Sequence, residues 1–155
     1  MRLAEALAAR ADLQRRIEQL RSRITGNARY QEGEEPAEDA AALLVEADAA
    51  LDQLRDLIRR INTTNSRVDL GADGTMTDAL ATRDVLRMRH SLLTDAATAA
   101  SGTDQGFMRQ MRSELRQFAA LPVAELRARA DDVARQLREL DGRIQQANWG
   151  HDLDE

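Results

Sequence analysis

The sequence predicts an all-α protein: an antiparallel bundle of about four long amphipathic helices with coiled-coil-like packing. Helix-favouring alanine, leucine and arginine dominate the composition, whereas aromatic residues make up only 3% of the 155 residues. Apolar residues recur at alternating spacings of three and four, which is typical of helices that pack along one another. Clusters of glycine, proline and short polar residues separate these periodic segments and indicate the connections between helices.

Length and charge limit the kind of protein this chain encodes. A single domain over 1–155 is expected to bury about 70% of the surface that its unfolded form exposes. The chain has no cysteine, which excludes thiol nucleophiles, thiolate metal sites and disulfides. Its net charge of −5 argues against nucleic acid as a partner. Neither a signal segment nor an apolar run approaching the ~20 residues of a membrane span is present, so we expect a cytoplasmic protein with no membrane partner.

The first expected helix spans residues 2–25. Its apolar residues fall on a three-four alternation, with one step of seven from Ala6 to Leu13: Leu3, Ala6, Leu13, Ile17, Leu20 and Ile24. Gly26 and Asn27 tolerate the left-handed conformation that ends many helices, so we expect the helix to end there.

The second expected helix spans residues 36–62. Pro36 has the fixed φ of a first-turn residue, and Glu38 and Asp39 place negative charge beside the positive end of the helix dipole. The apolar face of this helix is broad: Leu43, Leu44, Ala47, Ala50, Leu51, Leu54, Leu57, Ile58 and Ile61. The short polar residues and glycines that follow, over 62–75, predict a loop.

The third expected helix spans residues 76–100, with Thr75 or Thr77 as its cap. Its apolar residues fall on two sides. One side holds Ala81, Val85, Met88, Leu92, Ala96 and Ala99, and the next holds Ala79, Leu86, Leu93, Ala97 and Ala100. An arc this wide is expected of a helix that contacts more than one neighbour, so we predict that this helix is the most buried of the four.

The fourth expected helix spans residues 122–148 and has the clearest heptad pattern. Its apolar series is Val123, Leu126, Ala130, Val133, Leu137, Leu140, Ile144 and Ala147. The preceding stretch, 103–121, has apolar residues that fit a short helix, but it lies between Gly106 and Pro122, which leaves helix and irregular chain both open. The tail, 150–155, is short and acidic, and we expect it to fray.

Short stretches distributed over nearly the whole chain resemble a family of small, uncharacterised bacterial proteins that carry the label septicolysin. They are 3–7, 10–12, 33–38, 60–62 with Asn65, 77–84, 123–126, 138–141 and 148–149. The section 101–121 departs most from the family. The resemblance implies a compact helical protein of unknown function. The label implies a pore-forming toxin, but the chain lacks a membrane-spanning run and paired amphipathic strands, so we do not expect that activity.

Two arginines interrupt the apolar arcs. Arg10 lies in the arc of the first helix, and Arg89 lies in that of the third, on the same side as Asp78. A guanidinium buried alone is costly, so each arginine needs a carboxylate, a carbonyl or an anionic ligand. Internal ion pairs, a subunit interface and an anion-binding pocket all satisfy this need.

Further polar residues complete the candidate ligand-binding set. Arg83, Asp84 and His90, with Arg87 between them, form one edge of the third helix, which either faces a phosphate or is solvated. Asn62 and Asn65 come from the expected loop. No residue is identified as catalytic.

No metal and no cofactor is expected. Glu34, Glu35 and Glu38 have the Glu-Glu-x-x-Glu spacing with which all-α nucleotide pyrophosphatases hold magnesium, but no Glu-x-x-Asp partner follows on the second helix. The three carboxylates fit charge complementarity at a helix start instead. Only two histidines are present, which excludes a histidine-rich metal site within one chain.

Two functions remain as hypotheses. The first is a structural or interaction module that associates with copies of itself through an apolar face of the first, third or fourth helix. The alternative is a protein or enzyme that binds a phosphorylated or carboxylated ligand through the arginines on the apolar faces.

Overall fold

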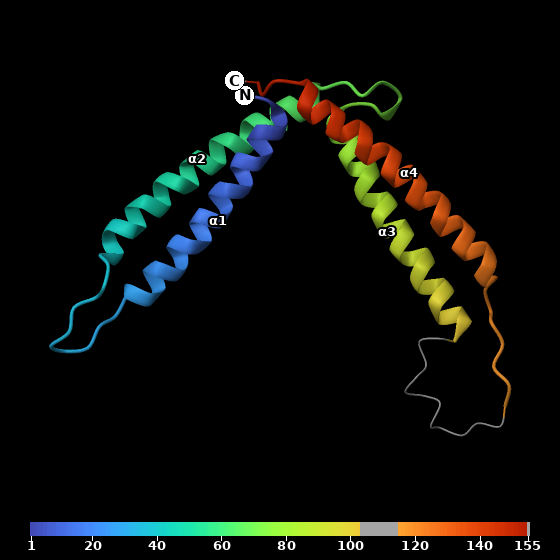
Figure 1. Cartoon of the computed structure of the whole chain (residues 1–155), viewed down its shortest axis with the longest axis horizontal. Coiled ribbons are helices and arrows are strands. Elements are labelled where there is room, and N and C mark those ends of the chain that lie inside the picture. Colours follow the sequence, from blue (N-terminus) through green and yellow to red (C-terminus); the bar gives the residue numbers. More distant parts are fainter. Residues whose placement is uncertain (103–114, 155) are drawn as a thin grey trace. The chain divides into compact units, whose positions relative to one another are not determined.

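The computed structural model describes residues 1–102 and 115–154, and in that part of the chain the fold is all-α, as predicted. The helices are α1 (Leu3–Asn27), α2 (Ala40–Arg67), α3 (Met76–Ser101) and α4 (Val123–Gly150), with a short 3₁₀ helix, η1 (Gly71–Asp73) (Figure 1). Most of the ambiguous stretch, 103–114, lies outside the described residues. The rest of it, 115–121, is irregular chain.

The chain divides into two compact units. The first consists of Met1–Asp69 and Gln145–Glu155, and the second of Leu70–Ile144. The first unit therefore holds α1, α2 and the last turns of α4, whereas the second holds η1, α3 and the rest of α4. The expectation of one domain over 1–155 stays a prediction.

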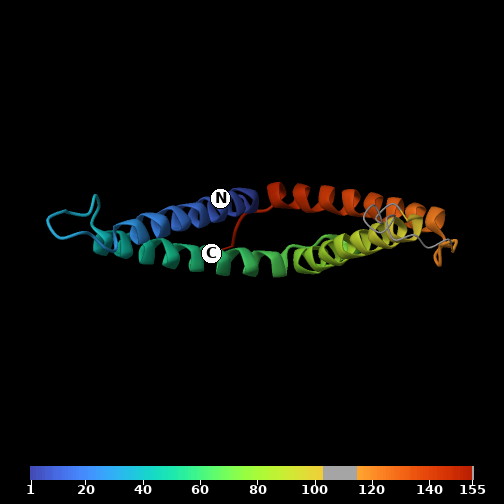
Figure 2. The same ribbon diagram turned by 90° about the horizontal axis from the view of Figure 1, so that it is seen from below.

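In the first unit, α1 and α2 run antiparallel and lie side by side in both views (Figures 1 and 2). Leu20, Leu43 and Ala47 form a buried cluster between them, with Ile24 packed against it. An ion pair crosses from Arg16 to Glu46 at 2.8 Å (Nη2 to Oε1), and a second joins Arg23 to Glu38. Apolar packing and these two pairs together set the register of the hairpin.

The ends that face the connector between α1 and α2 differ from the prediction. α1 ends at Asn27, but neither Gly26 nor Asn27 has a positive φ, so the expected left-handed cap is wrong. α2 begins at Ala40 rather than Pro36, because the Asp39 carboxylate accepts hydrogen bonds from the backbone N–H groups of Ala41 (2.9 Å) and Ala42 (3.2 Å). Pro36 thus lies in the connector.

The other end of α2 extends to Arg67, so the loop predicted from residue 62 is wrong for 62–67. Thr64 is 1% exposed, and its hydroxyl donates to the carbonyl of Arg60 (2.9 Å) and accepts from the N–H of Asp154 (2.9 Å). Because both hydrogen-bonding roles of this hydroxyl are occupied within the packed unit, Thr64 does not compete with the helical backbone.

The C-terminal tail is ordered from 151 to 154, so the prediction that it frays is wrong. Leu153 is buried, and its N–H donates to the carbonyl of Met1 at 2.9 Å. The N–H of Leu3 donates to the carbonyl of His151 at 3.0 Å, and the Nε of Arg60 donates to that of Asp154 at 2.9 Å. An apolar anchor and backbone hydrogen bonds thus hold the tail against α1 and α2.

In the second unit, α3 and α4 lie side by side in both views (Figures 1 and 2). The core of this unit consists of residues from both helices: Met76, Ala79, Leu86, Leu93, Ala97, Leu126, Ala130, Val133, Leu140 and Ile144. Thr75 caps α3 as predicted, because its hydroxyl accepts from the N–H of Asp78 (3.3 Å) while the Asp78 carboxylate accepts from the N–H of Thr75 (2.8 Å). Gly102, at φ 74°, ends α3 in the left-handed conformation.

Candidate functional site

Helix α3 carries two apolar faces that differ sharply in exposure. The inner face is buried, with Leu86 and Leu93 only 7% and 6% exposed. On the opposite side, Val85, Met88 and Leu92 are 52%, 70% and 69% exposed. The outer face consists of Ala81, Val85, Met88, Leu92, Ala96 and Ala99. Within the second unit, α3 therefore packs against one neighbouring helix, α4, rather than the two that were predicted. The prediction that α3 is the most buried of the four helices is wrong.

The outer face forms a continuous stripe. Val85, Met88 and Leu92 fall within about 60° of arc on the helical wheel, and the inner face lies roughly 130° further round. At 1.5 Å per residue, the stripe from Ala81 to Ala99 is about 27 Å long. Spacings of four, three and four between its first members are those of a coiled-coil seam.

Opposite charges lie beside this stripe. On one edge, the Asp84 carboxylate is 3.5 Å from the Nε of Arg83 and 4.0 Å from Nη1 of Arg87. On the other edge, Arg89 is exposed, and its side chain forms no ion pair or hydrogen bond within residues 1–102 and 115–154. The outer face thus has a carboxylate on one side and a free guanidinium on the other.

A hollow of about 300 Å³ indents the surface of α3 next to Arg89. Its lining consists of Ala81, Thr82, Val85, Leu86 and Arg89. Four of these, Thr82, Val85, Leu86 and Arg89, are spaced as i, i+3, i+4 and i+7. The hollow therefore lies on the flank of α3 between the outer face, to which Val85 belongs, and the inner face, to which Leu86 belongs.

The predicted charged edge of the third helix is present. Arg83, Asp84 and Arg87 lie together on α3, and Nη2 of Arg87 also lies 3.8 Å from the Asp141 carboxylate of α4. Sequence reasoning missed Asp141, because no local pattern indicates which residue of α4 faces Arg87. The Nε of Arg83 is buried and has no hydrogen-bond partner among the described residues, although Asp84 is at ion-pair distance.

Asp78 does not pair with Arg89. Its carboxylate accepts hydrogen bonds from the hydroxyl of Thr75 (2.7 Å) and from the N–H of Thr75 (2.8 Å), and these bonds lower the pKa of Asp78. Asp78 lies about three helical turns before Arg89. His90 is partly buried and lies on the inner side of α3. The expectation that Arg89 is buried and needs a partner is also wrong, because its side chain is exposed.

The remaining candidate residues belong to the first unit and do not form one site. Arg10 is partly buried on α1, while Asn62 and Asn65 lie on α2 rather than in a loop. The ion pairs of Arg16 and Arg23 fix the register of the hairpin, which puts Arg10 level with about residue 52 of α2. Arg10 is therefore about 15 Å along the helix axis from Asn62.

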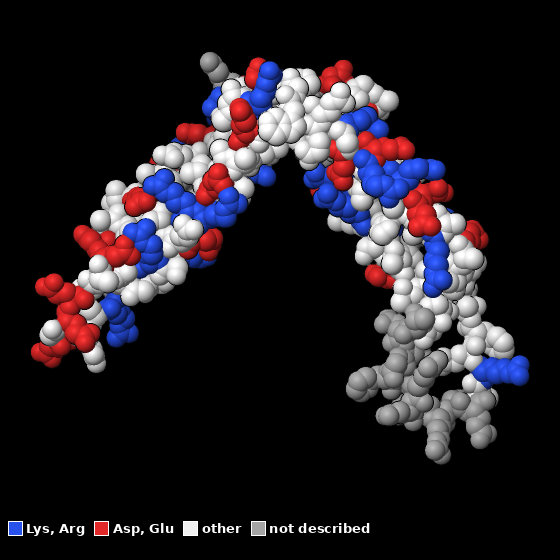
Figure 3. Space-filling view, in the orientation of Figure 1, with Lys and Arg blue, Asp and Glu red and all other residues white. Residues whose placement is uncertain are grey.

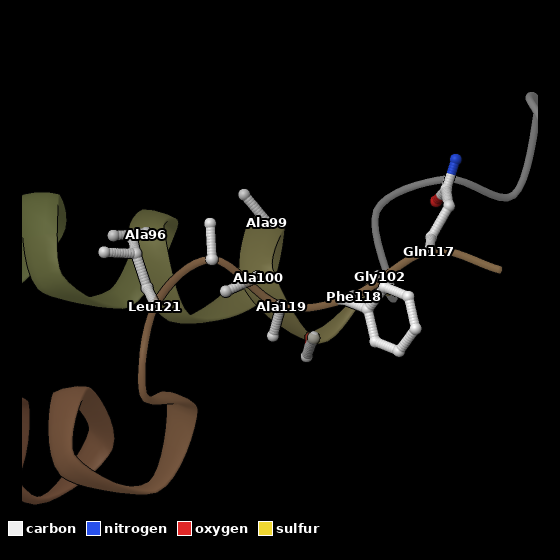
Figure 4. A pocket seen from close by; sticks show the side chains of 10 residues that line it. Ala96, Ala99, Ala100, Gly102, Gln117, Phe118, Ala119 and Leu121 are labelled. Atoms are coloured by element: carbon white, nitrogen blue, oxygen red, sulfur yellow. The ribbon is translucent and has the colours of Figure 1, made fainter.

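A larger hollow, of about 710 Å³, lies where the end of α3 meets residues 117–121 (Figure 4). The side chains shown there are mainly alanines, with Phe118, Leu121 and Gln117. None of its lining residues in the described part of the chain carries a charge or a group that titrates near neutral pH.

Charges of both signs alternate over the surface (Figure 3). Acidic side chains gather around the connector between α1 and α2, where Glu34 and Glu35 are exposed. Nearby, the hydrogen bond from Arg23 lowers the pKa of Glu38. In the described residues no three acidic or histidine side chains are arranged to hold a metal ion. No helix in that part of the chain combines the length and apolar character that crossing a bilayer requires.

The fold and its exposed face define a small all-α protein with an exposed apolar stripe on one helix. The chain belongs to a family of unknown function, DUF6847, whose model matches residues 10–153. It is similar to the crystal structure of a functionally unknown conserved protein from Corynebacterium diphtheriae, with a TM-score of 0.92 and 39% sequence identity over 99% of each chain. No curated protein matches it.

Proposed function

We propose that this protein is a self-associating helical module in which the outer face of α3 pairs with the same face of a second copy. The observation that carries the proposal is the exposure of Val85, Met88 and Leu92, at 52%, 70% and 69%, along one stripe of a well-formed helix. Contiguous exposed apolar surface of this kind is typical of interaction sites. A second copy brings an identical stripe, which is the requirement for a two-fold symmetric dimer.

The expected association is moderate in strength. Fully burying one Val, Leu or Met side chain stabilises by about 1.5–3 kcal/mol, and these side chains are already partly covered. Six of them, three from each copy, therefore contribute on the order of 10 kcal/mol. Loss of translational and rotational freedom costs about 4–15 kcal/mol. At the low end of this cost the balance is about −6 kcal/mol, which corresponds to a dimer with a Kd of tens of micromolar.

Light scattering coupled to gel filtration tests the proposal. The mass of one chain is 17.3 kDa, and we expect the wild-type protein to approach twice that value at roughly several hundred micromolar. Leu92→Glu places a charge in the stripe, and we expect it to shift the population to the monomer. Because Leu92 is exposed in the single chain, circular dichroism of the variant should remain that of the wild type.

Val45→Glu is the matched control. Val45 is 71% exposed, close to the 69% of Leu92, but the positions three and four residues from it are Ala41, Ala42, Asp48 and Ala49, so it belongs to no large apolar stripe. We expect the mass of this variant to equal that of the wild type. A wild-type protein that stays monomeric, or equal masses for Leu92→Glu and wild type, would contradict the proposal.

The setting that we propose is the cytoplasm. A chain without cysteine has no disulfide to form, so its composition does not require an oxidising compartment. Pore formation, the activity that the septicolysin label implies, is not part of the proposed function. Recovery of the native protein in a membrane fraction, or dye leakage from lipid vesicles on its addition, would argue against this assignment.

A further inference from the structure

The charges beside the outer face of α3 indicate the direction in which two copies pair. We infer that the two α3 helices run parallel and in register, with Asp84 of each copy beside Arg89 of the other. The inference rests on the proposed self-association and adds the geometry of the interface. It also accounts for the one guanidinium on this face that has no partner among the described residues of its own chain.

The heptad positions follow from the stripe. With Val85 and Leu92 as a residues, Ala81 and Met88 are d residues. Asp84 is then a g residue on one flank, and Arg89 is an e residue on the other. In a parallel coiled coil, each g residue reaches the e residue five positions later in the partner helix. This offset joins Asp84 to Arg89 of the second copy, and the two-fold symmetry forms the pair twice.

An antiparallel arrangement does not form these ion pairs. There, a residues face d residues, so Val85 faces Met88 and Ala81 faces Leu92 of the second copy. On the flanks, g residues face g residues and e residues face e residues. Asp84 then lies opposite Ser91, and Arg89 lies opposite Thr82. Packing of the apolar stripe is similar in both directions, so the flanking charges decide between them.

Asp95 sets the end of the paired segment. It occupies the d position after Leu92, and its carboxylate lies 3.5 Å from the hydroxyl of Ser91. Parallel pairing brings the two copies of Asp95 together and, at the preceding a position, the two copies of Asp78, whereas antiparallel pairing brings Asp95 opposite Asp78 twice. The number of like-charge contacts is therefore the same in both directions, and we expect the close contact to extend from about residue 81 to residue 92.

The hollow beside Arg89 borders the proposed contact. Thr82 and Arg89 are e residues and Leu86 is a b residue, so the hollow lies on the flank where Asp84 of the second copy approaches Arg89. A pair of surface ion pairs changes an association constant by only a few-fold to about tenfold. Reversing one charge, in Arg89→Glu, should weaken the dimer by such a factor, and adding Asp84→Arg in the same chain should restore it.

Cysteine cross-linking tests the direction without relying on charge. The chain has no cysteine, so a single introduced residue is its only thiol. In the parallel arrangement, Ala81→Cys lies beside its own copy, and we expect mild oxidation to convert most of the protein to a disulfide-linked dimer. In the antiparallel arrangement, the two sulfurs introduced by Ala81→Cys are separated by about 16 Å along the helices, too far for a disulfide.

A mixture of Ala81→Cys and Leu92→Cys chains, one of them tagged, tests the antiparallel arrangement, in which these two positions face each other. Val45→Cys measures the background of cross-links that form by random collision. Cross-linking of Ala81→Cys with itself, well above that background, supports the inference. Two results would overturn the parallel arrangement and leave self-association intact. One is selective cross-linking between the Ala81→Cys and Leu92→Cys chains. The other is cross-linking of Ala81→Cys only at the background level, in a protein that light scattering shows to be dimeric. A monomeric wild-type protein would remove both proposals.

Discussion

The α1–α2 hairpin and the α3–α4 hairpin expose apolar side chains in different patterns. On α2, Leu44 and Leu51 are 51% and 48% exposed, but Asp48 lies between them on the same side of the helix. On α3, Arg89 has the same place relative to Val85 and Leu92, but Met88 adds a third exposed apolar side chain, at 70%, where α2 has the buried Ala47. The exposed methionine thus distinguishes the face that we assign to association.

The two hairpins also differ in how their helices are joined. Arg16–Glu46 crosses between α1 and α2, Arg23–Glu38 joins α1 to the connector just before α2, and the C-terminal tail ties the first unit further. In the second unit, the pair across α3 and α4 is the longer Arg87–Asp141 contact, at 3.8 Å. The first hairpin is therefore tied by more polar contacts within the chain, whereas the second leaves the outer face of α3 exposed.

The largest expected effects come from the cores of the hairpins. Leu140 is 2% exposed and Leu20 is 1% exposed, so truncation of either to alanine should destabilise the protein by about 2–5 kcal/mol. Denaturation in urea measures this loss. Leu140 supports α3, so we expect Leu140→Ala also to lower the dimer mass. Leu20→Ala should leave association unchanged, and loss of dimer in both variants would contradict the separation of roles.

A smaller effect is expected from the tail of the first unit. Leu153 is 8% exposed and anchors the residues whose backbone bonds to Met1 and Leu3. Leu153→Ala should cost about 2 kcal/mol, at the low end for a buried leucine because the tail can relax. Hydrogen exchange should increase at the ends of α1 and α2, including Thr64. Unchanged exchange there would show that the tail does not stabilise this hairpin.

The smallest expected effect is a dependence of stability on acid. Hydrogen bonds lower the pKa of Glu38 in the first hairpin and of Asp78 in the second. A carboxylate whose pKa is lowered by folding contributes stability above its unfolded pKa and loses it as the pH falls through the folded pKa. Glu38→Gln and Asp78→Asn should therefore each lower Tm near neutral pH and match the wild type in strong acid. Differences in Tm that persist in acid would contradict this origin.

The helices could be predicted from the sequence, because leucine and alanine spacing directly reflects helical packing. Their ends could be predicted only where the cap is local, as at Thr75 and Asp78. At Ala40 two local signals competed, and the Asp39 carboxylate determines the start instead of Pro36. The extension of α2 through Thr64 depends on contact with Asp154, ninety residues away, which no local pattern reveals.

The candidate site could be predicted in part. The two apolar sides of α3 are visible in the spacing, and a second neighbour for the outer side stays a prediction. Which side packs inside the chain depends on α4, so the sequence did not indicate that Leu86 is buried while Met88 is exposed. The sequence correctly predicts that Arg89 lies among apolar residues of α3. The exposure of its side chain depends on which side of α3 packs against α4, which the sequence did not indicate. The grouping of Arg10 with Asn62 and Asn65 failed because the register of α1 and α2 separates them.

Oxidation of the native methionines tests most directly whether a second copy covers the outer face of α3. In the single chain, Met88 is 70% exposed, Met1 is 55% exposed and Met76 is 1% exposed, so Met88 and Met1 should react with peroxide at similar rates while Met76 stays protected. With most copies paired, we expect mass spectrometry to show Met88 oxidised about tenfold more slowly than Met1, with the difference lost on dilution. Oxidation of Met88 as fast as Met1 at every concentration would contradict the account.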